Sequence, residues 1–164
     1  MGALPAGKIA PAFSLKNVDR VQVSLTDALK KGPVLAAFFK VNCPTCQFTF
    51  PFLERLYETY GNSTFTLWGI SQNDAADTRE FCREFGIKFS MLVDGHGYPA
   101  SNQYGLTNVP TLFLISPEGK IQQTTVGFVK ADLEKLAAEA ARATGKPAVP
   151  LFKPGEVIPE SKPG

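Results

Sequence analysis

Two cysteines, Cys43 and Cys46, are separated by two residues and form the most chemically informative pair in this 164-residue sequence. Cys43 follows a predicted buried strand and directly precedes a predicted helix. We therefore expect it to be the N-cap, with Pro44 in the first turn, where a missing N–H costs nothing. The free N–H groups and dipole of a helix start stabilise an anion, which favours a Cys43 thiolate. Cys46, one turn later, could then attack a mixed disulfide formed at Cys43.

The sequence offers too few further ligands for Cys43 and Cys46 to belong to a metal site. A zinc site would need a second pair of ligands, and only Cys82 and His96 remain, at neither ribbon nor finger spacing. We expect no metal and no other cofactor. Cys82 is expected to be a small buried hydrophobe and His96 a solvated loop residue. Lys40, three residues before Cys43, could stabilise the thiolate electrostatically or point into solvent.

The elements that position the cysteines follow from the apolar pattern. The continuous apolar run 34–39 predicts a strand buried on both faces. Helical spacing over 44–60 predicts the next helix, which Gly61 ends. Further strands are predicted at 13–15, 21–25, 64–70, 91–93, 111–115 and 121–126, with helices ending at Phe85 and running through 129–140. This order predicts an α/β fold: a central mixed sheet with helices on both faces and a short N-terminal strand pair.

Several aromatic residues receive an expected place within these elements. Trp68 lies in a predicted interior strand and is expected in the core. Phe48 and Phe52 suit the core face of the helix that follows Cys43, whereas Phe50 is expected to face outward, near a partner-docking surface.

Composition excludes several classes of protein. Apolar residues make up 44% and charged residues 20%, too apolar a balance for a disordered chain. The net charge of +2 without a basic cluster argues against nucleic-acid binding. The longest apolar run is far below the roughly 18 residues that span a bilayer, and the first residues lack a secretory signal pattern. We expect a cytoplasmic monomer without membrane contact, or an extracytoplasmic protein if a leader has been removed.

The sequence divides into a domain over residues 1–144 and a tail over 145–164. Glycine and proline fill eight of the twenty tail positions, which excludes a helix and predicts an extended segment. Four apolar residues suggest that part of the tail lies along the domain: Leu151, Phe152, Val157 and Ile158.

Several motifs together resemble the thioredoxin superfamily, and more closely its redoxin branch, the thioredoxin-like thiol–disulfide oxidoreductases related to alkyl hydroperoxide reductases and peroxiredoxins. Residues 10–15 (APAFSL) are similar to the opening strand of the branch, and 34–46 to its active-site strand with the CxxC motif. Pro51 stands where thioredoxins kink the active-site helix. Residues 109–115 (VPTLFLI) are similar to the strand that begins with the family's cis-proline.

The resemblance implies a thioredoxin-like fold and an enzyme that exchanges a dithiol for a disulfide. Its substrates would be protein or small-molecule thiols and disulfides, together with an unidentified electron donor or acceptor. The Val109–Pro110 bond is expected to be cis and to lie against the cysteines. Val109, Pro110, Pro44 and Thr45 are then the expected substrate-binding residues.

The sequence departs from the family pattern at several positions, and two alternative functions are weighed against these departures. Ala37 stands where thioredoxins bury an aspartate, and Asn42 where many relatives have tryptophan. A peroxiredoxin would use Cys43 as its peroxidatic cysteine, yet Lys40, Ala36 and Pro110 replace the Thr or Ser, the proline and the arginine of that class. A copper-delivery protein would space its cysteines one residue further apart.

Overall fold

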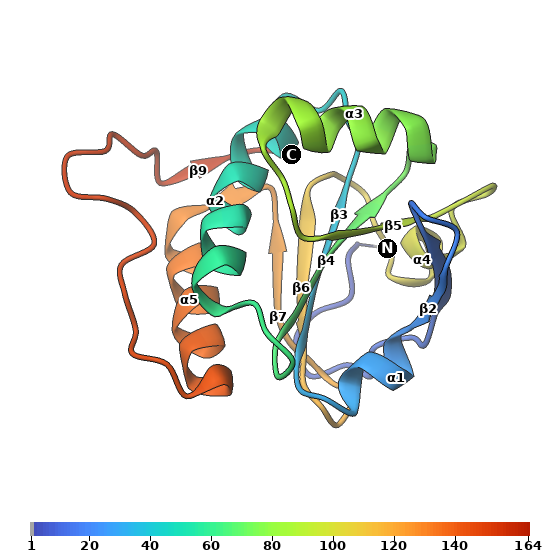
Figure 1. The fold of residues 1–164 in the computed structure, drawn as a ribbon, viewed down its shortest axis with the longest axis horizontal. Helices are drawn as coiled ribbons and strands as arrows, with labels where there is room; N and C mark the ends of the chain where they lie inside the picture. Colours follow the sequence, from blue (N-terminus) through green and yellow to red (C-terminus); the bar gives the residue numbers. More distant parts are fainter. Residues whose placement is uncertain (1) are drawn as a thin grey trace.

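A computed structural model describes residues 2–164 (Figure 1). Its strands are β1 (Ser14–Asn17), β2 (Gln22–Ser24), β3 (Val34–Phe39), β4 (Thr66–Ser71), β5 (Ser90–Val93), β6 (Thr111–Ile115) and β7 (Ile121–Val126). They form one seven-stranded sheet in the order β2-β1-β5-β4-β3-β6-β7. β3 pairs in parallel with β4, and β4 with β5, whereas the remaining pairs are antiparallel. The sheet is mixed, as predicted.

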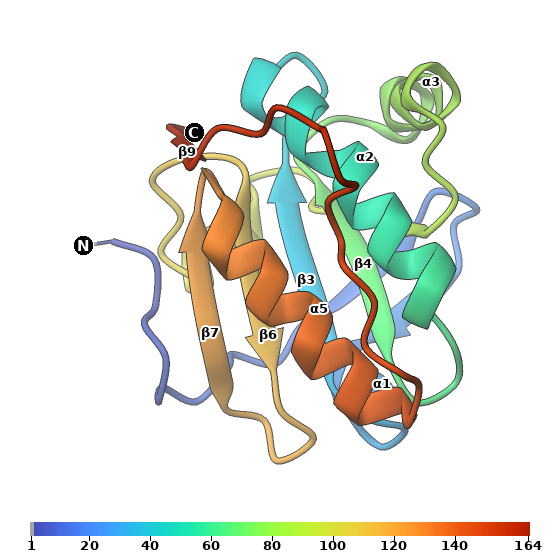
Figure 2. The same ribbon diagram turned by 90° about the vertical axis from the view of Figure 1, so that its left-hand side faces the viewer.

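Helices cover both faces of this sheet. They are α1 (Leu25–Leu29), α2 (Pro44–Tyr60), α3 (Ala75–Phe85), α4 (Pro99–Gln103) and α5 (Lys130–Thr144). Residues of α2, α3 and α5 share one apolar core with alternate residues of β3, and residues of α1 and α4 share the core on the opposite face. Figure 2 shows α2 and α5 side by side in front of the sheet.

β3 is the central strand, and all six of its residues are buried. Leu35, Ala37 and Phe39 contribute to the α2 side of the sheet, while Val34, Ala36 and Phe38 contribute to the other side. A strand with helices on both faces loses water from both sets of side chains, which explains the uninterrupted apolar run.

Local signals placed most element boundaries correctly. The predicted bounds of β3, α2, β6 and β7 are confirmed, and α3 ends before Gly86, whose φ of +70° is the left-handed C-cap conformation. Trp68 is buried, as predicted. The strand expected to run to Leu25 ends one residue earlier, because the Ser24 hydroxyl caps α1 by accepting a hydrogen bond from the Asp27 N–H at 3.1 Å.

Two expectations about apolar side chains were wrong. Phe50 is fully buried rather than outward-facing, because α3 covers that side of α2 and brings Phe81 against it. Val157 is 97% exposed, although Leu151, Phe152 and Ile158 do pack against the core.

The chain after α5 is extended and ends beside the first turn of α2. Gly145, with a φ of +69°, ends α5, and the following residues cross in front of α5 and α2 (Figure 2). Two two-residue strands, β8 (Phe128–Val129) and β9 (Ser161–Lys162), then pair antiparallel as a second sheet that the sequence did not predict.

Candidate active site

Cys43 occupies the junction between β3 and α2. It is the N-cap of α2, with φ −91° and ψ 116°, and Pro44 stands in the first turn, as predicted. Its Sγ accepts a hydrogen bond from the Cys46 N–H at 3.1 Å. The helix start therefore supplies the sulfur with a backbone donor, the interaction that stabilises developing negative charge there.

The loop before Cys43 is held by one side chain from the next βα connection and one from α2. The Val41 N–H donates to Asn73 Oδ1 at 3.0 Å, and Gln47 donates back to the Val41 carbonyl at 2.9 Å. The next residue, Asp74, caps α3 by accepting from the Asp77 N–H. Asn73 instead helps to position the active-site loop.

The Val109–Pro110 bond is cis, as predicted, and lies beside Cys43. The Cys43 thiol donates to the Val109 carbonyl, with 3.4 Å between sulfur and oxygen. Pro110 itself is buried, and its carbonyl accepts from the Gly127 N–H at 2.7 Å. The start of β6 and the start of α2 therefore meet at the Cys43 sulfur.

The thiols differ in their access to solvent and in their ionisation. Cys43 is partly exposed, whereas Cys46 is completely buried. Burial raises the pKa of Cys46 far above its ordinary value, and its interaction with Cys43 raises it further. Cys82 is partly exposed rather than buried as predicted, and desolvation, with a smaller contribution from Glu54, raises its pKa to about 11.

A hollow of about 460 Å³ opens next to Cys43. It is lined by Lys40, Cys43, Pro44, Gln72, Tyr98, Leu106, Thr107, Asn108, Val109 and Gly164. Four residues proposed from the sequence therefore lie around one space. Tyr98, Gln72 and Gly164 were missed, because they come from loops and the tail and carry no motif.

Thr45 and Lys40, the two proposed residues not yet described individually, have distinct surroundings. Thr45 lies outside the lining of the hollow, and its hydroxyl donates to the Pro163 carbonyl at 2.6 Å. Lys40 is exposed at the rim of the hollow, and its carbonyl accepts from the Cys43 N–H at 3.3 Å. Its contact with the active-site loop therefore passes through the main chain.

The position where thioredoxins bury an aspartate carries no ionisable group here, because it is occupied by Ala37, which is completely buried. The buried carboxylate of Glu54, on α2, holds the chain before β5. Its Oε1 accepts from the Lys88 and Phe89 N–H groups at 2.8 and 3.3 Å, just before β5. Within residues 2–164, no three His, Cys, Asp or Glu side chains group as metal ligands.

Residues 6–124 match the model of the AhpC/TSA family. The chain belongs to the AhpC/TSA family. Among curated proteins, it is 27% identical to the thiol–disulfide oxidoreductase ResA of Geobacillus thermodenitrificans over 135 residues, which covers 81% of this chain and 76% of ResA. ResA of Halalkalibacterium halodurans is 28% identical over 141 residues, covering 82% and 79% of the two chains.

A solved structure supports the same placement. The thioredoxin domain of a thiol–disulfide oxidoreductase from Bacteroides vulgatus superposes with a TM-score of 0.72 and 25% identity, covering 84% of this chain and 98% of that domain. The fold of this family member is therefore thioredoxin-like, with the mixed sheet that the sequence predicted. Across residues 2–164, no helix is both long and apolar enough to cross a bilayer.

Proposed function

We propose that this AhpC/TSA-family protein is a thiol–disulfide oxidoreductase that uses Cys43 and Cys46. One observation carries the proposal: a partly exposed cysteine at a helix start is followed, one turn later, by a completely buried cysteine. The names of the ResA relatives describe the same chemistry. Cys43 is the group that an incoming disulfide can reach, and Cys46 is shielded until Cys43 has reacted.

The exchange takes two balanced steps. The Cys43 thiolate attacks one sulfur of a substrate disulfide, a Cys43–substrate disulfide forms, and the other substrate sulfur leaves as a thiolate. Cys46, after losing its proton, attacks the Cys43 sulfur and releases the second substrate thiolate. Two electrons pass to the substrate, and a Cys43–Cys46 disulfide remains. The reverse sequence oxidises a dithiol substrate.

Burial of Cys46 restricts this thiol to the second step, the attack on the mixed disulfide at Cys43. A buried thiol with a raised pKa is a poor nucleophile toward outside disulfides, which protects the dithiol from reaction at the wrong sulfur. The Val109 carbonyl beside Cys43 is a main-chain acceptor for an extended substrate segment. Pro44, Thr45, Val109 and Pro110 form the proposed docking surface, with Lys40 as a proposed electrostatic modulator.

The test uses Cys46→Ser, which removes the resolving sulfur. This variant should accumulate a mixed disulfide between Cys43 and a substrate thiol, visible as an added mass in intact-protein mass spectrometry. Cys43→Ser should form no adduct and lose exchange activity, and Cys82→Ser is the matched control that should exchange normally. Absence of any adduct on Cys46→Ser would contradict the two-step scheme.

A peroxidase that uses Cys43 is the alternative, because residues 42–45 (NCPT) resemble the segment around the peroxidatic cysteine of peroxiredoxins. The same variant separates the two activities. Rapid hydrogen peroxide turnover by Cys46→Ser with an external thiol would favour the peroxidase, whereas slow turnover with a trapped mixed disulfide favours exchange.

The partners within this proposal are protein or small-molecule thiols and disulfides, with an electron donor or acceptor of the same chemistry. The expected monomeric state is tested by sedimentation of the purified protein. The expected cytoplasmic location is tested by fractionation of cells that produce the full-length protein.

A further inference from the structure

The chain beyond α5 is anchored along α2 before it reaches the active site. The Val149 N–H donates to the Tyr60 hydroxyl at 2.8 Å, and Leu151 is buried in the core between the helices. The Phe152 ring packs against Phe52 of α2, with 5.1 Å between the ring centroids. These contacts fix residues 149–152 to the helix that begins with the cysteine motif.

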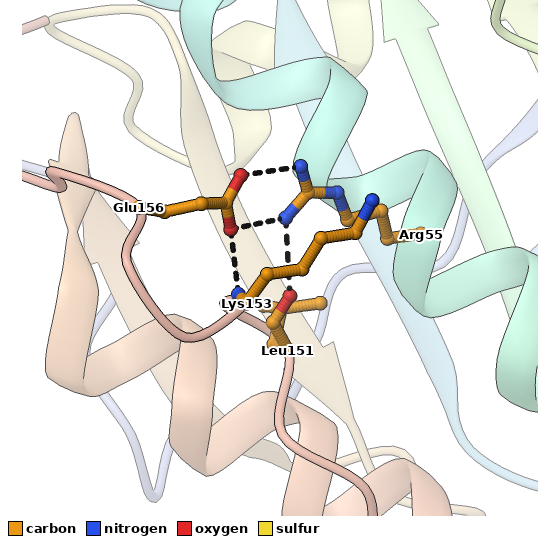
Figure 3. A network of polar contacts seen from close by, with 4 residues as sticks. All are labelled: Arg55, Leu151, Lys153 and Glu156. Carbon is orange, nitrogen blue, oxygen red and sulfur yellow. Dashed lines mark hydrogen bonds and ion pairs between the residues drawn. The ribbon is translucent and has the colours of Figure 1, made fainter.

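A charged clamp follows these apolar contacts (Figure 3). Both Arg55 Nη atoms donate to the two carboxylate oxygens of Glu156, at 2.8 and 2.7 Å, and Arg55 also donates to the Leu151 carbonyl at 3.3 Å. The Lys153 N–H donates to the same carboxylate at 2.6 Å. A bidentate pair fixes direction as well as distance, so the clamp orients the segment that continues toward Cys43.

Beyond the clamp, the chain adds a strand beside the active site. β9 pairs with β8 in the register Lys162 to Phe128 and Ser161 to Val129, and the Lys130 N–H donates to the Glu160 carbonyl at 2.9 Å. The Lys162 ammonium lies 5.0 Å from the centroid of the Phe48 ring on α2. Main-chain pairing of this kind is how an extended polypeptide docks on an exposed strand edge.

The last residues of this segment lie over the candidate docking surface. Thr45, between the two cysteines, donates its hydroxyl to the Pro163 carbonyl at 2.6 Å. Gly164 lines the hollow next to Cys43, and Asn108 donates to its oxygen at 3.4 Å. A Cβ at Gly164 would lie only 2.6 Å from the Val109 oxygen, so main chain lies directly against main chain here.

Gly127 shows how closely the two segments approach. Its φ of +76° is unusual for other residues, and a Cβ there would lie 2.6 Å from the Lys162 oxygen and 2.9 Å from the Gly164 nitrogen. By contrast, the side chains of residues 161–164 are all exposed. Apart from the contact of Lys162 with Phe48, the segment is therefore held by its main chain, and its release would uncover little apolar surface.

We propose that residues 161–164 are an intramolecular cap that occupies the docking surface for extended polypeptide substrates beside Cys43. The proposal rests on the thiol–disulfide exchange proposed above. A protein disulfide must displace the cap before its chain can lie against Val109, whereas a small disulfide reaches the partly exposed Cys43 through the hollow. The Arg55–Glu156 clamp keeps the released cap close to its site, which raises its effective concentration and favours its return. The cap therefore selects between substrates by size.

The first arm of the test compares exchange rates of the reduced full-length protein with those of a variant lacking residues 161–164. Insulin is the protein disulfide and dithiodipyridine the small one. Loss of the cap should raise the rate constant for insulin reduction about tenfold, which corresponds to the loss of one or two net hydrogen bonds. The rate constant for dithiodipyridine should change by less than about twofold. Equal rates of insulin reduction by the two proteins would overturn the proposal.

A charge variant addresses the clamp without shortening the chain. Glu156→Gln loses the ion pair with Arg55, so insulin reduction should become faster, by less than in the shortened variant. Glu160→Gln is the matched control, because it removes the same charge from the same segment, and the contact of Glu160 with Lys130 uses its main chain. Equal rates for the two glutamine variants would show that the clamp does not hold the cap.

The second arm needs no exchange activity and so separates the two proposals. Cys43 is alkylated with iodoacetamide or with a maleimide on a long polyethylene glycol chain. Removing residues 161–164 should accelerate only the bulky reagent. If that acceleration occurs while no variant reduces either disulfide, the cap stands and the proposed function fails. If disulfides are reduced but the alkylation ratio is unchanged, the cap fails and the proposed function stands.

Discussion

At the scale of single residues, the position of each sulfur decides its reactivity. Cys43 combines partial exposure with a helix start, Cys46 is fully buried, and Cys82 has a pKa raised to about 11 from 9.0. Two pKa units correspond to an about hundredfold smaller thiolate fraction near neutral pH, and the thiolate is the reactive form. The three cysteines therefore differ in their surroundings, and we expect them to differ in reactivity.

We expect iodoacetamide to modify Cys43 first near neutral pH, with Cys82 and Cys46 following much more slowly. Peptide mapping by mass spectrometry after short labelling times gives the order directly. Labelling of Cys82 should become faster as the pH rises toward 11, because its thiolate then forms. If Cys82 were labelled first in the native protein at neutral pH, the assignment of Cys43 as the nucleophile would be wrong.

At the scale of elements, α2 is held in place by aromatic packing on more than one side. Phe50 lies 4.4 Å from Phe39 of β3 and 5.6 Å from Phe81 of α3, measured between ring centroids. Phe52, in the middle of the helix, packs against Phe152 of the tail, and Tyr60, at its last turn, accepts a hydrogen bond from the tail. The helix that presents Cys43 is therefore fixed by the sheet, by α3 and by the chain after α5.

We expect Phe50→Ala to lower the free energy of unfolding by about 3–5 kcal/mol, because it leaves a cavity in a completely buried aromatic cluster. Urea unfolding followed by circular dichroism measures the loss. Phe85→Ala is the control: Phe85 also contacts Phe81 but is partly exposed, so its loss should be clearly smaller. Equal losses for the two variants would contradict the buried position of Phe50.

At the scale of the whole molecule, one ion pair connects the active-site helix to the tail. The guanidinium of Arg55, followed by the Lys153 N–H, holds the pKa of Glu156 at about 2, below its ordinary value of 4.5. A carboxylate with a lowered pKa in the folded state stabilises that state above its ordinary pKa. The stabilisation is lost as the pH falls from about 4.5 through about 2.

We therefore expect the difference in unfolding free energy between the native protein and Glu156→Gln to depend on pH. The difference should be constant from neutral pH down to about 4.5 and should shrink toward zero near pH 2. Urea titrations at pH 7, 4 and 2.5 measure it. The same comparison with Glu160→Gln should show no such dependence, and a difference for Glu156→Gln that persists unchanged at pH 2.5 would contradict the ion pair.

The sequence by itself determined the chemistry and the elements that carry it. The CxxC spacing, the apolar run of β3, Pro44 and Gly61 are local signals, and they placed Cys43 at the N-cap of a helix with Cys46 one turn inside it. The bounds of β6 and β7 and the end of α3 at Phe85 were also predicted, because the signals for them are local. Each of these features depends on residues a few positions apart, where periodicity and capping act.

Only the tertiary structure decided what surrounds the sulfur and where the tail lies. Thr45 and Pro163 are 118 positions apart, and Arg55 and Glu156 are 101 apart, so no local pattern pairs them. Phe50 was misplaced for the same reason, because its burial depends on α3 rather than on the period of α2. The tail's composition predicted an extended chain. It could not predict the partner strand, because an extended chain pairs through its main chain and the fold decides which strand edge lies within reach.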